Sequence, residues 1–192
     1  MERRHNNTEV RTDDKKITGY ASVFYDGTKA SEFQLWKGAV ERIDPDAFNR
    51  AIKEKHDVRA LYNHDPDNLL GRLSSNTLNL SVDNKGLRYE IEYDEHDSDH
   101  QRVRSKIQRG DLTGSSFAFR VTGEKWEEEN DQEVRTITDL DLIDVGPVTF
   151  PAYESSTTGV RHASEARSSY DKWQNKLATE RRLQKLEQMK TI

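Results

Sequence analysis

The sequence contains no cysteine. This absence excludes disulfide bonds, thiolate catalysis, cysteine-ligated zinc and iron–sulfur clusters, and it fits a reducing compartment. The N-terminus has no apolar run behind its basic residues, so no signal peptide is visible. No stretch approaches the roughly 18 apolar residues that a membrane span needs. We therefore expect a soluble protein with no membrane partner.

Apolar side chains are also scarce. They make up 32% of the 192 residues, and charged side chains make up 34%, whereas an average globular chain is roughly 45–50% apolar. The formal net charge of −5 argues against a general nucleic-acid binder, which usually carries a basic face. The shortage of apolar residues lies mainly at the two ends of the chain. We expect a disordered arm at 1–16, one folded domain at 17–153, a linker at 154–164 and a charged helical tail at 165–192.

β-Branched and aromatic residues predict a strand-rich domain. The expected elements are strands at 17–25, 36–43, 58–64, 116–121 and 134–145, a hairpin over 77–93, and an acidic loop at 124–133. Asp44 and Pro45 are typical of an N-cap and first helical position, and predict a helix to about residue 55. The capping-box pattern at 98–101 begins a second helix, which Gly110 ends. These elements predict an α+β fold, with a partly closed barrel as its core.

A histidine that ends an apolar strand is the first candidate for chemistry. Among the six histidines, His64 alone lies where an apolar strand turns sharply, so that the sheet can hold the ring while it faces a cleft. A catalytic serine needs such a base, and a third group that orients the base. The alternative for His64 is a surface histidine at a strand end.

Two neighbouring serines and one aspartate offer the other two groups. Ser116 alternates with Phe117 and Phe119 at the start of a strand, which turns it away from the aromatic face. From the residues alone, Ser115 and Ser116 can equally be strand-entry residues bonded to local backbone. Asp144 falls in phase with Leu142 on the apolar side of its strand, where a carboxylate needs a partner. It pairs with a histidine there, or a bulge near residues 146–147 returns it to solvent.

A metal-dependent hydrolase is a further hypothesis. Residues 94–100 combine carboxylates with His96 and His100, and His64 could join them. The spacing matches no known metal-binding loop, and the capping box already accounts for this segment. We therefore favour the structural interpretation of these histidines.

Five segments, in this order, resemble the prohead proteases of tailed phages. They are GYA (19–21) with Phe24, ERIDPDAF (41–48), LYNHD (61–65) with Gly71 and Arg72, GDLTGSSFAF (110–119) and LIDVGPVTFPAY (142–153). The family is similar in fold to the herpesvirus assemblin proteases, which implies a β-barrel surrounded by helices. The family histidine corresponds to His64 and its serine to Ser116 rather than Ser115. Its acidic position, often Glu, corresponds to Asp144.

The resemblance implies a serine endopeptidase that needs no cofactor or metal. Its expected substrates are the major capsid protein, scaffolding segments and the protease itself, inside the immature capsid in the host cytoplasm. The alternative is a non-catalytic capsid-assembly or scaffolding protein with the same fold. The tail either addresses the enzyme to the scaffold or shell, or pairs protomers, or is a solvated helical end.

Overall fold

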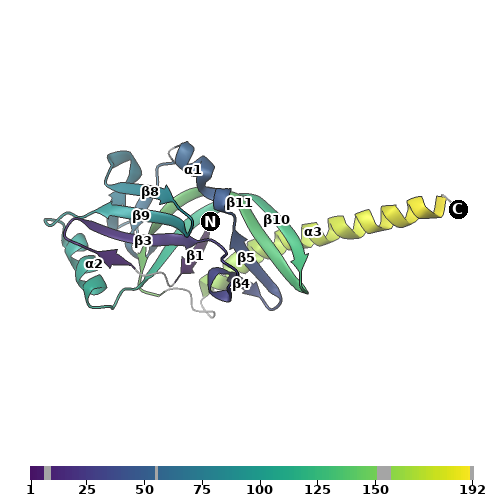
Figure 1. Ribbon diagram of the computed structural model, residues 1–192, viewed down its shortest axis with the longest axis horizontal. Helices are drawn as coiled ribbons and strands as arrows, with labels where there is room; N and C mark the ends of the chain where they lie inside the picture. Colours follow the sequence, from purple (N-terminus) through teal and green to yellow (C-terminus); the bar gives the residue numbers. More distant parts are fainter. Residues whose placement is uncertain (7–9, 55, 151–156, 191–192) are drawn as a thin grey trace.

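The computed structural model describes residues 1–6, 10–54, 56–150 and 157–190 (Figure 1). Its strands are β1 (Glu2–Asn6), β2 (Arg11–Thr12), β3 (Lys16–Val23), β4 (Phe33–Trp36), β5 (Ala39–Ile43), β6 (Arg59–Leu61), β7 (Leu69–Arg72), β8 (Leu78–Val82), β9 (Gly86–Glu92), β10 (Gly114–Glu129) and β11 (Gln132–Val148). Its helices are η1 (Lys29–Ser31), η2 (Pro45–Phe48), α1 (Asn49–Lys53), η3 (Tyr62–His64), η4 (Leu73–Ser75), α2 (Ser98–Gln108) and α3 (Thr157–Lys190). The expected α+β class agrees with this mixture.

The strands form two sheets. The first has the order β1-β10-β11-β5-β4, with β6 paired to both β11 and β7, and the second has the order β2-β3-β9-β8. No closed barrel is found among the described residues, so the expected barrel core is not confirmed. The long β10 and β11 strands pair antiparallel and carry the first sheet, whereas β5 and β6 join β11 in parallel.

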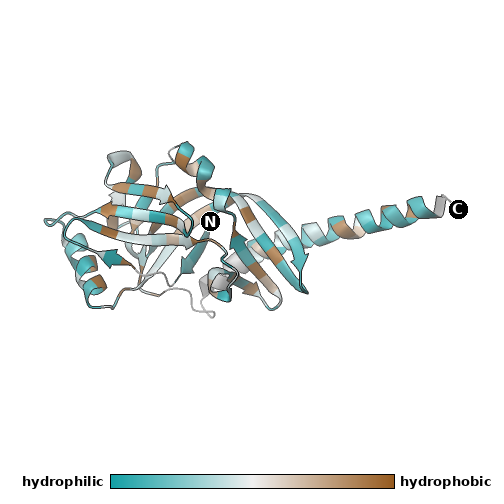
Figure 2. Cartoon of the chain, viewed as in Figure 1, coloured by the Kyte–Doolittle hydropathy of each residue, from teal (hydrophilic) through white to brown (hydrophobic). Residues whose placement is uncertain are grey.

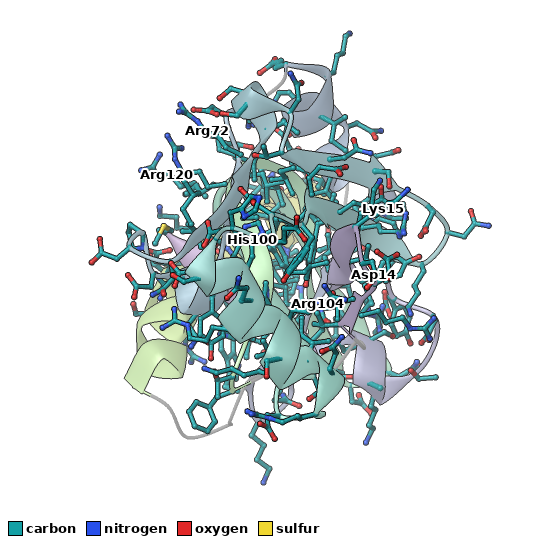
Figure 3. All side chains as sticks on the ribbon, turned by 90° about the vertical axis from the view of Figure 1, so that its left-hand side faces the viewer. Asp14, Lys15, Arg72, His100, Arg104 and Arg120 are labelled. Carbon is teal, nitrogen blue, oxygen red and sulfur yellow. The ribbon has the colours of Figure 1, made fainter. Side chains whose placement is uncertain are left out.

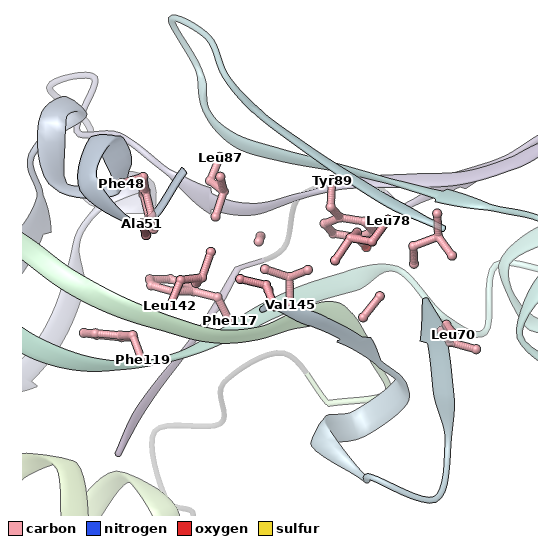
Figure 4. Packing of buried hydrophobic residues seen from close by; sticks show 14 of the residues in the cluster. Phe48, Ala51, Leu70, Leu78, Leu87, Tyr89, Phe117, Phe119, Leu142 and Val145 are labelled. Atoms are coloured by element: carbon pink, nitrogen blue, oxygen red, sulfur yellow. The ribbon is translucent and has the colours of Figure 1, made fainter. Parts of the chain in front are cut away.

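The core lies between these sheets. Phe117, Phe119 and Val145 extend from β10 and β11, and Leu87 and Tyr89 extend from β9 toward them (Figure 4). All five side chains are completely buried. Apolar and polar residues alternate along the strands (Figure 2), because successive side chains of a strand point to opposite faces. This alternation leaves one face of β10 and β11 for polar side chains.

The N-terminal segment differs from the expectation of a disordered arm. Residues 2–6 form β1, an edge strand that pairs with β10, and β2 follows; residues 7–9 lie outside the described part. The polar composition of β1 was misleading because its charges are paired inside the protein. The Arg4 guanidinium donates to Glu41 from Nε, at 2.5 Å, and from Nη2, at 2.8 Å. Buried charges are tolerated when they are paired in this way.

Several other loop and helix boundaries also differ from those expected from the sequence. The expected acidic loop at 124–133 is a continuation of β10 and β11, joined by Asn130 and Asp131, whose φ angles of 50° and 60° suit a tight hairpin turn. The cap of α2 is Asp97, which accepts from two backbone N–H groups, rather than Ser98. Asp44 does cap the helix that follows it, by accepting from the Asp46 backbone N–H.

The C-terminal helix is longer than expected. α3 begins at Thr157, so the second part of the expected linker is helical, while residues 154–156 lie outside the described part. Trp126 of β10 contacts its first half, with ring centroids 5.2 Å from Tyr170 and 6.2 Å from Trp173. The rest of α3 extends away from the sheets (Figure 1). Among the described residues, we find no helix that combines the length and apolarity needed to cross a membrane.

Candidate active site

His64 lies in a strained turn directly after β6. Asn63 and His64 both have φ 58°, in the left-handed region that residues other than glycine rarely adopt. Thr149, just beyond β11, holds this turn: its backbone N–H donates to Asn63 Oδ1 at 2.8 Å, and Asn63 Nδ2 donates to its Oγ1 at 3.1 Å. Strain of this kind persists only where surrounding contacts fix it. The turn therefore places the buried His64 ring in one orientation.

The two candidate serines face opposite sides of the first sheet. Ser116 Oγ lies 2.5 Å from His64 Nε2. Ser115 Oγ instead lies 2.9 Å from the hydroxyl of Tyr89, in the core between the sheets. Burial raises the pKa of Tyr89, so this hydroxyl stays neutral. The structure thus brings Ser116, and not Ser115, to the histidine.

Asp144 completes the arrangement from β11. Its Oδ1 lies 2.5 Å from His64 Nδ1, and its side chain is buried. The expected phase was wrong, because Asp144 pairs with Ala118 while Leu142 pairs with Phe119, which leaves Ile143 as an extra residue. This β-bulge moves Asp144 off the apolar face. It does not return the carboxylate to solvent, as one alternative expected, but directs it to His64.

The three side chains lie in line, each within hydrogen-bond distance of the next. A carboxylate only accepts, so His64 Nδ1–H donates to Asp144. The neutral ring then has its lone pair on Nε2, which faces the Ser116 hydroxyl. This is the tautomer in which an imidazole can take a proton from serine.

A glycine allows the chain that leads into the histidine turn to lie close against β11. A Cβ on Gly146 would lie 2.2 Å from the Leu61 carbonyl oxygen, closer than any ordinary contact. Gly146 also pairs with Ser116 across the strands. A side chain here would therefore push β6 and η3 away from the serine strand.

The residues of the metal hypothesis do not meet in the structure. His100 lies on α2 (Figure 3), where its Nε2–H donates to the Leu70 carbonyl at 2.8 Å and its Nδ1 accepts from the Asp94 N–H at 3.0 Å. Both ring nitrogens are thus engaged. The His96 side chain is 88% exposed. Within the described residues, no group of three or more histidine and carboxylate side chains could hold a metal ion.

Sequence reasoning missed the supports of the histidine turn. Tyr62 OH lies 2.7 Å from Thr149 Oγ1 and accepts from Lys106 Nζ at 3.1 Å. Burial acts to raise the Tyr62 pKa, but the bonds with Thr149 and Lys106 outweigh it and hold that pKa below its ordinary value. An available signal was Asn63, because asparagine is among the few residues enriched in left-handed backbone. Its partner Thr149 is 86 positions away and carries no comparable signal.

Comparison of the sequence with known protein families gives one match. The family described as caudovirus prohead serine protease matches residues 2–171. Neither the curated proteins nor the solved structures gave a match. The family match starts within β1, so it includes the strand that composition had assigned to a disordered arm. With most of its length matched, this chain belongs to the caudovirus prohead serine protease family.

Proposed function

We propose that this protein is a serine endopeptidase that cleaves the major capsid protein and its scaffolding segment inside the immature phage capsid. Ser116 is the nucleophile, His64 the general base and Asp144 the residue that orients the imidazole. The observation that carries this proposal is the continuous contact Asp144–His64–Ser116, with 2.5 Å at each step. Family membership supports the same class of enzyme and the same role in capsid maturation.

The mechanism is acyl transfer. Ser116 Oγ attacks a peptide carbonyl while His64 Nε2 takes its proton, and His64 then returns that proton to the leaving amine. Water, activated by the same base, hydrolyses the resulting acyl-enzyme and frees Ser116. Asp144 stabilises the imidazolium that forms between these steps. A positioned base of this kind contributes roughly 10²–10⁴-fold to the rate. The three side chains provide this chemistry without a cofactor. In the same proposal, the enzyme also cleaves its own chain where a suitable segment is accessible.

The two serines allow a matched test. The purified Ser116→Ala variant should no longer cleave the capsid protein. The Ser115→Ala variant loses the bond to Tyr89 but should still cleave the capsid protein, and mass spectrometry should find the same new termini as with the wild-type enzyme. Cleavage by Ser116→Ala at the wild-type rate would refute the assignment. A wild-type chain that binds capsid protein without cleaving it would favour the alternative, a non-catalytic assembly protein.

A further inference from the structure

The strand β1 covers the candidate nucleophile. It forms the edge of the first sheet and pairs antiparallel with β10, with His5 opposite Ser116. The Arg4 carbonyl oxygen accepts from Ser116 Oγ at 2.9 Å, and the His5 ring packs edge-on to His64 at 5.7 Å between centroids. Ser116 is 0% exposed. A substrate therefore cannot reach Oγ while β1 stays in place.

β1 also competes for the serine proton. Ser116 has one hydroxyl hydrogen, but both His64 Nε2 and the Arg4 carbonyl oxygen lie within hydrogen-bond distance of its Oγ. A hydroxyl donates one hydrogen bond at a time. The bond to Arg4 therefore takes the hydrogen away from the base. The arrangement is that of a peptide strand held against a resting site.

We propose that the edge of β10 now paired with β1 is the substrate-binding site, and that β1 leaves it before catalysis. The substrate adds there as an extended strand antiparallel to β10, and one of its basic side chains replaces Arg4. This inference rests on the proposed endopeptidase function. Addition of a strand to a sheet edge is a common way to bind an extended peptide, because the backbone supplies the hydrogen bonds.

The surroundings of Arg4 explain why the incoming side chain is basic. Glu41 is completely buried; its Oε1 accepts from Arg4, and its Oε2 accepts from both Arg4 and Arg135. Arg135 also pairs with Glu124. Departure of β1 takes the Arg4 guanidinium from Glu41, so that Oε1 loses this donor and Oε2 keeps the one from Arg135. A buried carboxylate that loses its cation is strongly disfavoured, so arginine or lysine fits this place.

A pocket extends the same site along β10. It has a volume of about 410 Å³ and is lined by Glu2 together with residues 120–124. Glu2 pairs with Phe119, so a strand continued backward from Glu2 would run beside these residues. The pocket thus offers room for further residues of a bound polypeptide, beyond the stretch that β1 occupies.

A disulfide lock tests whether β1 must leave. Arg3 and Ala118 are paired across the two strands, and paired residues of antiparallel strands have the Cα separation that a disulfide needs. Because the natural chain has no cysteine, Arg3→Cys with Ala118→Cys gives a single pair. The oxidised full-length variant should cleave capsid protein at least tenfold more slowly than the same variant after reduction. The single variant Arg3→Cys cannot form this disulfide, so its cleavage rate should be the same after oxidation and after reduction.

Equal rates for the oxidised and reduced double variant would overturn the inference. An inactive wild-type chain would instead refute the proposed protease, and the inference with it, so the unmodified protein separates the two failures.

A second measurement tests the basic subsite on the substrate. In peptides that span the mapped capsid cleavage site, replacement of the basic residue by glutamine should lower kcat/KM at least tenfold. Glu41→Gln should reduce this preference, whereas Glu128→Gln, an exposed residue of β10 outside this charge cluster, should keep it. Efficient cleavage of sites that lack arginine and lysine would contradict the subsite, and this outcome does not depend on any variant of the enzyme.

Discussion

Leu142 and Asp144 are two residues apart on β11, yet their side chains lie on opposite faces of the sheet. Leu142 pairs with Phe119 on the core side, and Asp144 pairs with Ala118 on the side of Ser116. Residues two apart in a regular strand share a face, so the extra residue Ile143 makes the difference. This bulge gives one strand both a core residue and a partner for His64.

Replacement of the Asp144 carboxylate should remove most activity without unfolding the protein. In Asp144→Asn the amide can donate to His64 Nδ1 and favour the wrong tautomer, so we expect kcat to fall by about 10⁴-fold. Steady-state cleavage of a capsid-derived peptide measures this. Asp141→Asn is the control, because Asp141 lies on the same strand but contacts Arg50. Full activity in Asp144→Asn would exclude an orienting role.

The stability of the left-handed turn should depend on two properties of Asn63: its tolerance of left-handed backbone and the hydrogen bonds of its side-chain amide. Asn63→Ala loses two hydrogen bonds to Thr149 and pays for left-handed backbone, so we expect a loss of about 1–3 kcal/mol in the free energy of unfolding. Asn63→Gly loses the bonds but tolerates the backbone, and should fall between alanine and wild type. Urea denaturation gives these values. A glycine variant less stable than the alanine variant would argue against strain in this turn.

A methyl group at residue 146 should separate the histidine turn from the serine strand. In Gly146→Ala the added Cβ meets the Leu61 carbonyl oxygen, and we expect a loss of about 1–3 kcal/mol together with reduced kcat. Gly38→Ala is the matched control, since Gly38 has φ 89° but no atom within 4 Å of an added Cβ. Thermal unfolding and peptide cleavage should both be measured. Equal effects of the two substitutions would show that the close approach is unimportant.

Glu2 should contribute stability that acid removes. Burial acts to raise its pKa, but Arg4 and Arg135 outweigh this and hold the pKa below the ordinary value of 4.5. A lowered pKa means that the contribution is complete above about pH 4.5 and is lost as the pH falls through the folded-state pKa. Glu2→Gln should therefore be less stable by about 1.5–3 kcal/mol at pH 7. The difference should shrink in acid.

Urea unfolding at several pH values measures the difference in the free energy of unfolding between Glu2→Gln and the wild type. The exposed Glu128→Gln variant should track the wild type throughout. A gap between Glu2→Gln and wild type that widens in acid would have the wrong sign and would refute the assignment.

The two halves of α3 should differ in their importance for stability. Residues 178–188 are all exposed, so ending the chain after residue 178 should change the free energy of unfolding by less than about 0.5 kcal/mol. Trp126→Ala removes a buried ring that packs on Trp36 and Tyr170, and should lose about 3–5 kcal/mol. Thermal unfolding of the shortened chain, of Trp126→Ala and of the wild type measures these differences in stability.

If the exposed half of α3 addresses the enzyme to the capsid, the shortened chain should cleave peptides normally but be missing from purified immature capsids. Normal packaging of the shortened chain would favour a solvated helical end.

Local sequence patterns were sufficient to predict the local part of the fold. Alternation predicted the hairpin of β8 and β9, and Asp44 with Pro45 predicted the helix start at η2, because such patterns depend on near neighbours. His64 was singled out by its place after an apolar strand. Ser116 needed the resemblance to a family, since a serine pair at a strand entry has no local feature that separates one member from the other.

Residues that are distant in the sequence meet through pairings that exist only in the folded sheets. The bulge at Ile143 depends on pairing with β10, and the place of β1 depends on buried charges from Glu41 and Arg135, far along the chain. A polar segment such as 2–6 has the composition of a disordered arm until its partners are known. Its position over Ser116 is therefore a property of the folded sheet, because backbone pairing and charge pairing across that sheet, rather than local preference, hold it there.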